Sequence, residues 1–292
     1  MLHHFILTRF NIRTFRHDKH GKSIDYESWL EDRLSLFETY TLPSVIGQTC
    51  QDFTWVLLVD SNTPADYRER MKGYRKRCPQ ISFISVKEQY GWKFAIVFQQ
   101  VVEKMLREKG AQAGDLCLTT YFDNDDCLHR DYVNDVRELL LHDDKKMLSE
   151  EGFIMYDYGI QYYTELGIAT RIKYANNHFL TLFETVSSAE CPSVRTCYGY
   201  GSHFTVEKRG VVPVHHIAQA DKPMWIEVIH QGNVDNDVKM TLHTSFVKDQ
   251  TLLRTAFSLN IDLQTGKRLK FFTRYFKQIL RRFRYRLFPR KW

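Results

Sequence analysis

The chain has 292 residues, 43% of them hydrophobic and 14% aromatic, and a formal net charge of +6. This length suits one large α/β domain, or a domain with an appendage, and such a chain buries a substantial core. No segment approaches the roughly 18 apolar residues of a membrane span, and no signal peptide is visible at the N-terminus. Six cysteines lack the paired spacing of a zinc site, so we expect free thiols in a reducing cytosol.

The first half of the chain alternates between apolar, β-prone runs and segments with helical spacing. The expected strands are 4–10, 53–60, 81–86 and 116–122, and the expected helices are 26–41, 65–77, 91–107 and 131–142. Pro43 breaks or restarts the first helix before the second strand. This alternation is typical of a parallel, doubly wound sheet, and α/β folds bind their ligands at the carboxyl edge of such a sheet.

The pattern changes after residue 146. Antiparallel strands are expected over 152–175, a helix over 178–186 and a strand over 196–206, whereas 211–245 shows only weak periodicity. Residues 250–265 are followed by Gly266, which is typical of the end of an element, and 268–288 is expected to form a helix.

Three carboxylates, Asp123, Asp125 and Asp126, follow the fourth expected strand within four residues. Like charges this close repel one another, and each loses hydration beside a buried strand. A divalent cation offsets this cost, because Mg²⁺ or Mn²⁺ takes one or two carboxylates together with the oxygens of a diphosphate. The cluster therefore predicts a metal–nucleotide site. Taken alone, it would more simply be a solvated acidic turn.

Other motifs accompany the cluster. Segment 43–61, with Ser44, Gln48 and Thr49 before a strand that ends in Asp60, resembles the start of family-2-type glycosyltransferases. The aspartate cluster falls where that family carries its DxD metal motif. Segment 225–236 and the first strand are similar to a bacterial subfamily of rhamnosyltransferases.

The resemblance implies a GT-A-type (Rossmann-like) fold of mostly parallel strands flanked by helices, with a smaller antiparallel region on the acceptor side. It implies a domain over 1–255, with a nucleotide-sugar half (1–145) and an acceptor half (146–255), followed by a tail over 256–292. The implied reaction moves a sugar, rhamnose by the subfamily name, from a UDP- or dTDP-linked donor to a glycan or lipid-linked acceptor in surface-polysaccharide synthesis.

The resemblance also assigns residues to the donor. Asp60 accepts a hydrogen bond from a uracil or thymine imide, while Thr8, Arg9 and Asn11 lie in the loop that wraps the base. Lys93 is placed to reach a phosphate or the base. Asp60 is equally suited to capping the helix that follows it.

Asp125 is the implied direct ligand of Mn²⁺ or Mg²⁺, with Asp123 on the ribose or on a metal-bound water. Asn124 is a spacer that touches the ribose, and Asp126 supports the site. His230, in segment 225–236, is the best histidine partner for the metal or diphosphate, although a structural role is as plausible for a single histidine. His203 is a weaker alternative.

The pair His215–His216 is weaker still, because adjacent side chains diverge on a helix or a strand. The catalytic base is implied to be a carboxylate at the start of a helix in the second half. Glu184 is the first choice, with Glu227 and Asp221 behind it. The Glu-Asp pair that the family carries before this helix is absent, which leaves both the base and the stereochemical outcome open.

Residues 267–292 contain eleven Lys and Arg and no acidic residue, so the remaining chain carries −5. A helix here places apolar side chains on one stripe and cations elsewhere, which is the profile of a helix lying in an anionic membrane surface. Packing on the body and nucleic-acid binding are the alternatives, but no nucleic-acid-binding signature accompanies the tail. We expect a cytoplasmic protein, peripheral at the inner face of the membrane. The expected stripe is Phe272, Phe276, Ile279, Phe283 and Leu287.

Other functions remain open. Phosphoryl chemistry of the haloacid-dehalogenase type wants Thr or Val at 127 after the first strand, but the chain has Cys127 after the fourth. A calcium loop that starts at Asp123 needs Gly at 128 and finds Leu128. A non-catalytic transferase-like protein that binds nucleotide or glycan is the third alternative.

Overall fold

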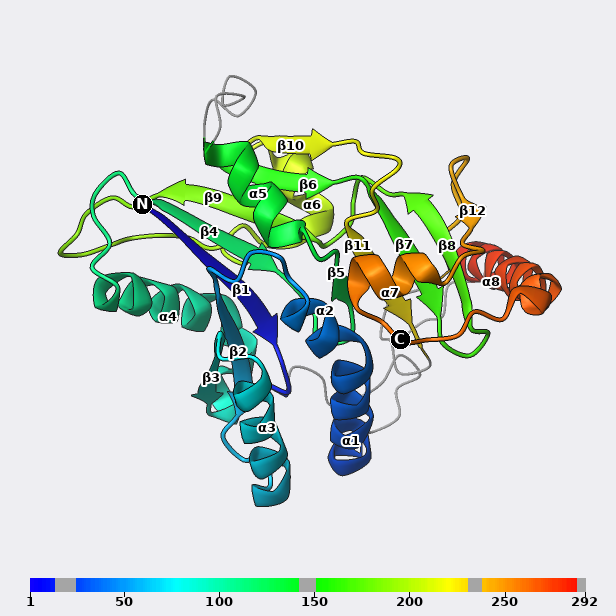
Figure 1. Ribbon diagram of the computed structural model, residues 1–292, viewed down its shortest axis with the longest axis horizontal. Helices are drawn as coiled ribbons and strands as arrows, with labels where there is room; N and C mark the ends of the chain where they lie inside the picture. Colours follow the sequence, from blue (N-terminus) through cyan, green and yellow to red (C-terminus); the bar gives the residue numbers. More distant parts are fainter. Residues whose placement is uncertain (14–24, 142–150, 231–237, 288–292) are drawn as a thin grey trace.

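A computed structural model describes residues 1–13, 25–141, 151–230 and 238–287. Two sheets lie side by side, and helices pack around them (Figure 1). Over the described ranges, the central sheet has seven strands in the order β10-β6-β9-β4-β1-β2-β3. Their bounds are β1 Leu2–Arg9, β2 Thr54–Asp60, β3 Ile81–Val86, β4 Leu116–Tyr121, β6 Gly152–Tyr156, β9 Leu180–Thr185 and β10 Val214–Ile217.

Most neighbouring strands of this sheet run parallel. β1 pairs parallel with β2 and β4, β2 with β3, and β10 with β6, whereas β9 runs antiparallel to both of its neighbours. The predicted α/β class, with a mostly parallel sheet flanked by helices, is confirmed. The strand order reverses beside β1, so the carboxyl ends of β1, β2 and β4 border the crevice where such folds bind ligands.

The predicted helix over 178–186 is wrong. Leu180–Thr185 forms β9, which is inserted between β4 and β6. Leu180 and Leu182 pack in the core on one face of the sheet, and Phe183 packs on the other. A strand buried on both faces reads as a continuous apolar run, and periodicity cannot distinguish such a run from a buried helix.

The predicted strand over 196–206 is also wrong. Turns occupy this segment, and helix α6 begins at His203. Thr196 and Gly201 both have a positive φ, which ends any extended run. The weakly periodic segment 211–245 contributes strands to both sheets.

The second sheet has the order β12-β8-β7-β11-β5 within the described residues. Apart from the parallel pair β7–β11, its strands are antiparallel, as predicted for the smaller region. The loop that carries the aspartates leaves the central sheet at the end of β4 and enters this sheet at β5. It therefore joins the two sheets. The bounds are β5 Cys127–Leu128, β7 Tyr158–Tyr163, β8 Ile168–Lys173, β11 Trp225–Ile229 and β12 Ser245–Phe246.

Helices cover both faces of the central sheet. α1, α3 and α5 pack on one face through side chains such as Leu34, Met71 and Val136, and α4 and α6 pack on the other through Phe98 and Val206. The helix bounds are α1 Tyr26–Leu36, α2 Leu42–Ile46, α3 Ala65–Arg77, α4 Phe94–Glu108, α5 Tyr132–Leu141, α6 His203–Arg209, α7 Thr251–Phe257 and α8 Arg268–Leu287. A π-helical turn, Phe37–Thr41, joins α1 to α2, so the chain stays helical through Pro43.

The structure gives no linker at the predicted border between residues 255 and 256. This border falls inside α7, whose Leu253 and Phe257 are fully buried against the second sheet. The two predicted halves also share one sheet, because β6, β9 and β10 complete the sheet that β1–β4 begin. Among the described residues, no helix has the length and apolar character needed to cross a membrane.

We predict that Gly159→Ala lowers the free energy of unfolding by about 1–3 kcal/mol, because a β-carbon at this position of β7 would overlap the indole of Trp225. The indole is fully buried and stacks on Phe179 with ring centroids 4.9 Å apart. Urea denaturation measures the change. Gly73→Ala is the matched control: it lies in α3 with open space around it, and should stabilise the protein by about 0.5–1 kcal/mol. Equal stability of the two variants would contradict the packing of Trp225 on β7.

Candidate active site at the carboxyl edge of the sheet

Asn11 and Asp60, both predicted to hold the base, meet between the ends of β1 and β2. The backbone N–H of Asp60 donates to Asn11 Oδ1 at 3.0 Å, and Asn11 Nδ2 donates to Thr63 Oγ1 at 2.8 Å. Asp60 also forms an ion pair with Arg13 Nε at 2.8 Å and accepts the N–H of Asn62 at 2.8 Å. Asp60 therefore shapes the turn after β2, and the buried cluster lies beside the crevice where the base was expected.

The structure does not support the base-binding role predicted for Thr8. Its side chain is fully buried, and its hydroxyl accepts the indole N–H of Trp55 at 3.0 Å. It therefore faces the core, because alternate residues of a strand point to opposite faces and its neighbour Arg9 points to the other side. Lys93 is exposed where the chain enters α4, so its side chain is accessible to a ligand.

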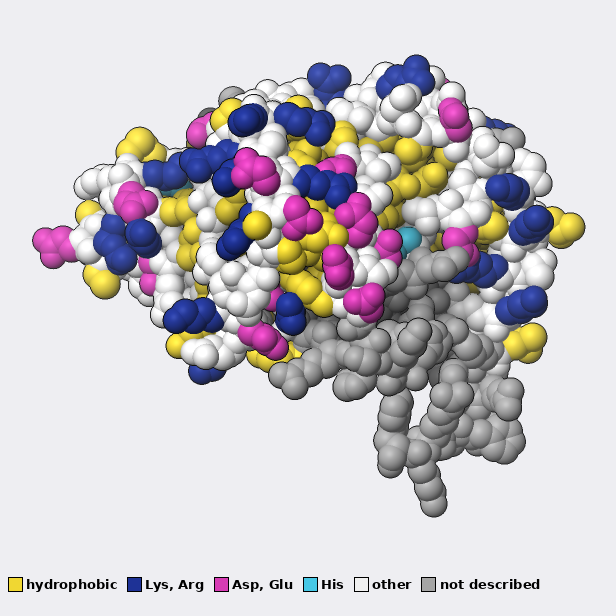
Figure 2. Space-filling model, turned by 90° about the horizontal axis from the view of Figure 1, so that it is seen from below, with side chains coloured by type: hydrophobic (Ala, Val, Ile, Leu, Met, Phe, Trp, Pro, Cys, Tyr) yellow, Lys and Arg dark blue, Asp and Glu magenta, His cyan; other side chains and the backbone are white. Residues whose placement is uncertain are grey.

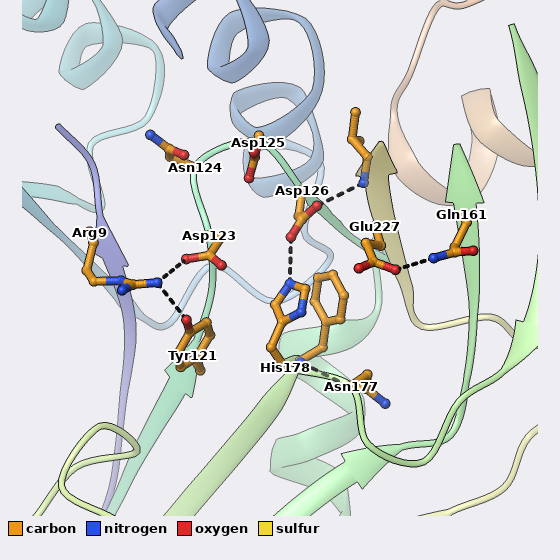
Figure 3. A network of polar contacts seen from close by, with 12 residues as sticks. Arg9, Tyr121, Asp123, Asn124, Asp125, Asp126, Gln161, Asn177, His178 and Glu227 are labelled. Carbon is orange, nitrogen blue, oxygen red and sulfur yellow. Dashed lines mark hydrogen bonds and ion pairs between the residues drawn. The ribbon is translucent and has the colours of Figure 1, made fainter. Parts of the chain in front are cut away.

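Arg9 lies on the other side of β1, beside the end of β4. Its Nη2 donates to the hydroxyl of Tyr121 at 2.7 Å and to Asp123 Oδ1 at 3.2 Å. The guanidinium also lies over the rings of Phe94 and Tyr198, at 4.9 and 5.8 Å from their centroids. Arg9 is thus fixed against the first aspartate of the loop rather than wrapped around a base, and it places a permanent positive charge at this edge (Figure 3).

Asp125 and His230, which the sequence pairs as metal ligands, are in contact although 105 residues separate them. His230 Nε2 lies 2.9 Å from Asp125 Oδ2, and Arg33 Nη1 donates to the same oxygen at 2.7 Å. Arg33 also donates to Asn124 Oδ1 at 3.3 Å. Burial opposes ionisation, but Arg33 and His230 hold the pKa of Asp125 well below its usual range. The carboxylate therefore stays charged.

Asp126 forms a second buried pair. His178 Nε2 donates to Asp126 Oδ2 at 2.6 Å, and the N–H of Val228 donates to Oδ1 at 2.9 Å (Figure 3). Burial lowers the pKa of His178, but the hydrogen bond and the charge of Asp126 outweigh burial and raise it to about 9. His178 is therefore a cation at neutral pH, and it ties the loop between β8 and β9 to the aspartates.

The structure reveals a group of possible metal ligands that differs from the predicted one. Asp123, Asp126 and His178 offer ligand atoms that all lie within 4.8 Å of one another. The sequence did not indicate His178, because the incorrect helix over 178–186 began there. Nor did it indicate Arg33, since no local pattern links a residue of α1 to the aspartate loop. In Figure 2, acidic side chains gather on the face that is seen from below.

The structure places Glu184, the first choice for the catalytic base, away from the aspartate loop. Glu184 pairs with Cys117 in the sheet, six residues before Asp123 along β4, which is on the order of 20 Å from the aspartate loop. Its two oxygens accept the backbone N–H groups of Arg195 and Thr196 at 2.9 and 3.0 Å. Glu184 thus holds a loop at the opposite edge of the sheet.

Glu227 lies beside the site on β11, next to Val228. Gln161 Nε2 donates to it at 2.5 Å (Figure 3). Lys239 Nζ forms an ion pair with it at 2.7 Å. Its side chain is 2% exposed, and both of its oxygens are engaged in this buried network. Asp221, the other carboxylate considered, is exposed before β11.

The alternative histidines lie in two different parts of the structure. The ring of His203, at the start of α6, lies 6.0 Å from that of Tyr121 and 5.7 Å from that of His178, so it borders the site. His215 and His216 lie on β10, the edge strand three positions from β4. His216 Nδ1 pairs with Asp157 at 2.6 Å. The pair at 215–216 is therefore remote from the aspartate loop.

Comparison with solved structures finds TarS of S. aureus. The structure of its residues 1–349 has a TM-score of 0.40, with 8% identity over 78% of this chain and 60% of that chain. The structure of the same segment in complex with UDP-GlcNAc has a TM-score of 0.41, with 9% identity over 80% of this chain and 60% of that chain. The chain thus spans about 60% of the length of these structures. A search of the curated proteins finds no match.

A family model described as "Putative rhamnosyl transferase" matches residues 5–242. The match spans the central sheet, the aspartate loop and His230, which are the elements that form the site. The chain therefore belongs to this family of glycosyltransferases.

Proposed function

We propose that the protein transfers a sugar, with rhamnose as the first candidate, from a nucleotide-diphosphate sugar to a hydroxyl of a glycan or lipid-linked acceptor. The contact between Asp125 and His230 carries this proposal. It brings a carboxylate at the end of β4 and an imidazole at the end of β11 to one point at the carboxyl edge, where α/β sheets bind nucleotides. The proposal extends the family assignment to a donor, a metal and an acceptor.

The donor would lie along the ends of β2, β1 and β4. The imide N–H of a uracil or thymine would have to compete with Arg13 for the carboxylate of Asp60, which is buried beside Asn11. In this arrangement Arg9 and Lys93 would supply positive charge for the diphosphate, and Asp123 and Asn124 would contact the ribose. A leaving diphosphate gains negative charge as its bond to the sugar breaks, so fixed cations at this edge favour the transition state.

The residues fit a divalent cation. Two neighbouring ligands of an octahedral Mg²⁺ or Mn²⁺, each at about 2.1 Å, lie about 3 Å apart, and Asp125 Oδ2 and His230 Nε2 are separated by 2.9 Å. We propose that these two atoms hold the ion, with Asp123 on a bound water. Such an ion neutralises charge on the leaving diphosphate. Arg33 orients Asp125, and Arg9 orients Asp123.

The triad of Asp123, Asp126 and His178 is the second candidate for the cation, since its ligand atoms also converge. Two observations rank it lower. Burial lowers the pKa of His178, but its hydrogen bond to Asp126 raises it, so a metal at this imidazole would have to displace a proton. In addition, both oxygens of Asp126 accept hydrogen bonds, whereas Arg33 and His230 both contact a single oxygen of Asp125, Oδ2.

On the acceptor side we propose Glu227 as the catalytic base of an inverting transfer. It lies on the second sheet next to the strand residue that holds Asp126, and removing a proton from an acceptor would require it to leave Lys239. We place the reaction in the cytoplasm, at the inner face of the cell membrane, in surface-polysaccharide synthesis. The cationic tail supports this location.

We predict that His230→Gln weakens binding of Mn²⁺ about tenfold or more, whereas His178→Gln leaves it within about twofold. Each substitution removes one imidazole that contacts an aspartate of the same loop, so each is the matched control of the other. Tenfold weakening corresponds to about 1.4 kcal/mol of binding free energy. Calorimetric titration with MnCl₂, with and without UDP, measures the effect. The reverse pattern would place the ion in the triad, and no binding to the wild type would contradict both sites.

We predict that either UDP- or dTDP-linked sugars raise the melting temperature in the presence of Mn²⁺, while GDP-linked sugars do not. A ligand present at 100 times its Kd adds about 2.7 kcal/mol to the stability of the folded state. The shift should disappear in Asp125→Asn, which keeps the shape of the side chain but removes its charge. A melting curve of that variant without ligand controls for its own stability. If no nucleotide sugar shifts the wild type, the transferase proposal fails in favour of glycan binding without catalysis.

A further inference from the structure

Helix α8 presents two opposite faces, one packed on the body and one exposed. Its side chains are described through Leu280. Phe271 is fully buried, with its ring edge-on to that of Tyr163 at 4.9 Å, and Gln278 is 7% exposed. This inner face therefore packs on the body, which was one of the alternatives expected for the tail.

The outer face carries a row of exposed apolar side chains: Leu269, Phe276 and Leu280 are 79%, 61% and 68% exposed. At about 100° per residue these three positions fall within roughly 40° of one another, on the side opposite Phe271 and Gln278. Three large apolar side chains exposed in one row form a patch that water solvates poorly.

This row differs from the stripe expected from sequence. Phe276 belongs to both, but Phe272 and Ile279 are half-buried, and Phe272 packs against the core of the second sheet. The side chains of Phe283 and Leu287 lie outside the described part of the helix. Part of the apolar stripe that the sequence predicted for membrane contact is therefore packed against the body.

Cations lie beside the row. Lys270 and Lys277 are exposed about two turns apart along its flank, at about 80–100° from its centre. Arg274 turns toward the body and pairs with Glu165. The sequence from 267 to 292 adds no acidic residue, so nothing in this segment offsets the positive charge. Figure 2 shows Lys and Arg side chains beside hydrophobic ones at the end of the molecule where α8 lies.

The helix is attached to the sheet that carries the acceptor-side residues. Gln278 Nε2 donates to the carbonyl oxygen of Val238 at 3.0 Å, and its Oε1 accepts the N–H of Val238 at 3.2 Å. Val238 adjoins Lys239, whose ammonium group holds Glu227 on β11. A surface that binds the outer face of α8 is therefore fixed in position relative to the acceptor side of the site.

We propose that the outer face of α8 binds the surface of an anionic lipid bilayer, with Leu269, Phe276 and Leu280 in the acyl region and the lysines at the headgroups. The apolar row favours a membrane over a nucleic acid, which needs the cations alone, and the cations favour anionic lipids over an apolar protein partner. The proposal rests on the proposed function only in that a lipid-linked acceptor would lie at the same surface.

The test is flotation of the full-length protein with phosphatidylcholine vesicles, with or without phosphatidylglycerol. We expect binding to the anionic vesicles alone, weakened by salt, and weakened about tenfold or more in the triple variant Leu269→Ser/Phe276→Ser/Leu280→Ser. The matched control is Leu141→Ser/Val211→Ser/Leu242→Ser, which removes three exposed apolar side chains elsewhere. It should bind vesicles as the wild type does.

Two results would overturn the proposal. One is a folded wild type that does not bind anionic vesicles; the other is a triple variant that binds them as tightly as the wild type does. Binding of a duplex RNA distinguishes a membrane from a nucleic acid as the partner. The triple variant should no longer bind vesicles but should keep any affinity for RNA. Vesicle binding needs no nucleotide, and donor binding needs no vesicle. The triple variant should therefore keep the thermal shift with its donor, and failure of one proposal leaves the other testable.

Discussion

The site depends on the neutralisation of three aspartates in one loop, of which Asp125 and Asp126 are buried and Asp123 is partly exposed. Asp125 is held by Arg33 from α1 and by His230 after β11, Asp126 by His178 before β9, and Asp123 by Arg9 from β1. Leaving one of these charges buried without a partner would cost several kcal/mol, so the loop forms only when all four elements are in place. The cations that stabilise the loop are also the groups that would meet the phosphates of a donor.

The same loop explains why the two sheets act as one structure. It leaves β4 in the central sheet and enters β5 in the second, and the N–H of Val228 in β11 donates to Asp126 across this junction. In the proposed reaction, the donor would meet residues from the ends of β1, β2 and β4, and the acceptor would meet residues from β11 and the segment at Lys239. The second sheet also supports α8, so one rigid assembly would relate the membrane surface to the reacting groups.

The geometry argues against two of the three alternative functions and leaves the third. A haloacid-dehalogenase nucleophile needs an aspartate free to attack, but Asp123 pairs with Arg9 and follows the strand β4, not β1. A calcium loop that starts at Asp123 needs an oxygen ligand at 127 and glycine at 128, whereas Cys127 and Leu128 form strand β5 there. Binding of a nucleotide sugar without catalysis uses the same residues as transfer does. The ion pair between Glu227 and Lys239 bears on the choice between binding and transfer, because a catalytic base must be able to release Lys239.

The sequence by itself determined the parallel half of the fold and the identity of the central loop. The strands and helices up to α5 lie within a few residues of their predicted places, because apolar spacing and the turn residues between segments are local signals. The motif at 225–236 also indicated His230 as the partner of Asp125. Only the tertiary structure decided that Leu180–Thr185 is a strand, which removed Glu184 from the site and revealed His178. Likewise, only packing showed that Thr8 faces the core, that Arg33 reaches Asp125, and which face of α8 stays exposed. Those outcomes depend on long-range neighbours, and a buried apolar run or a single arginine carries no local signal of its partner.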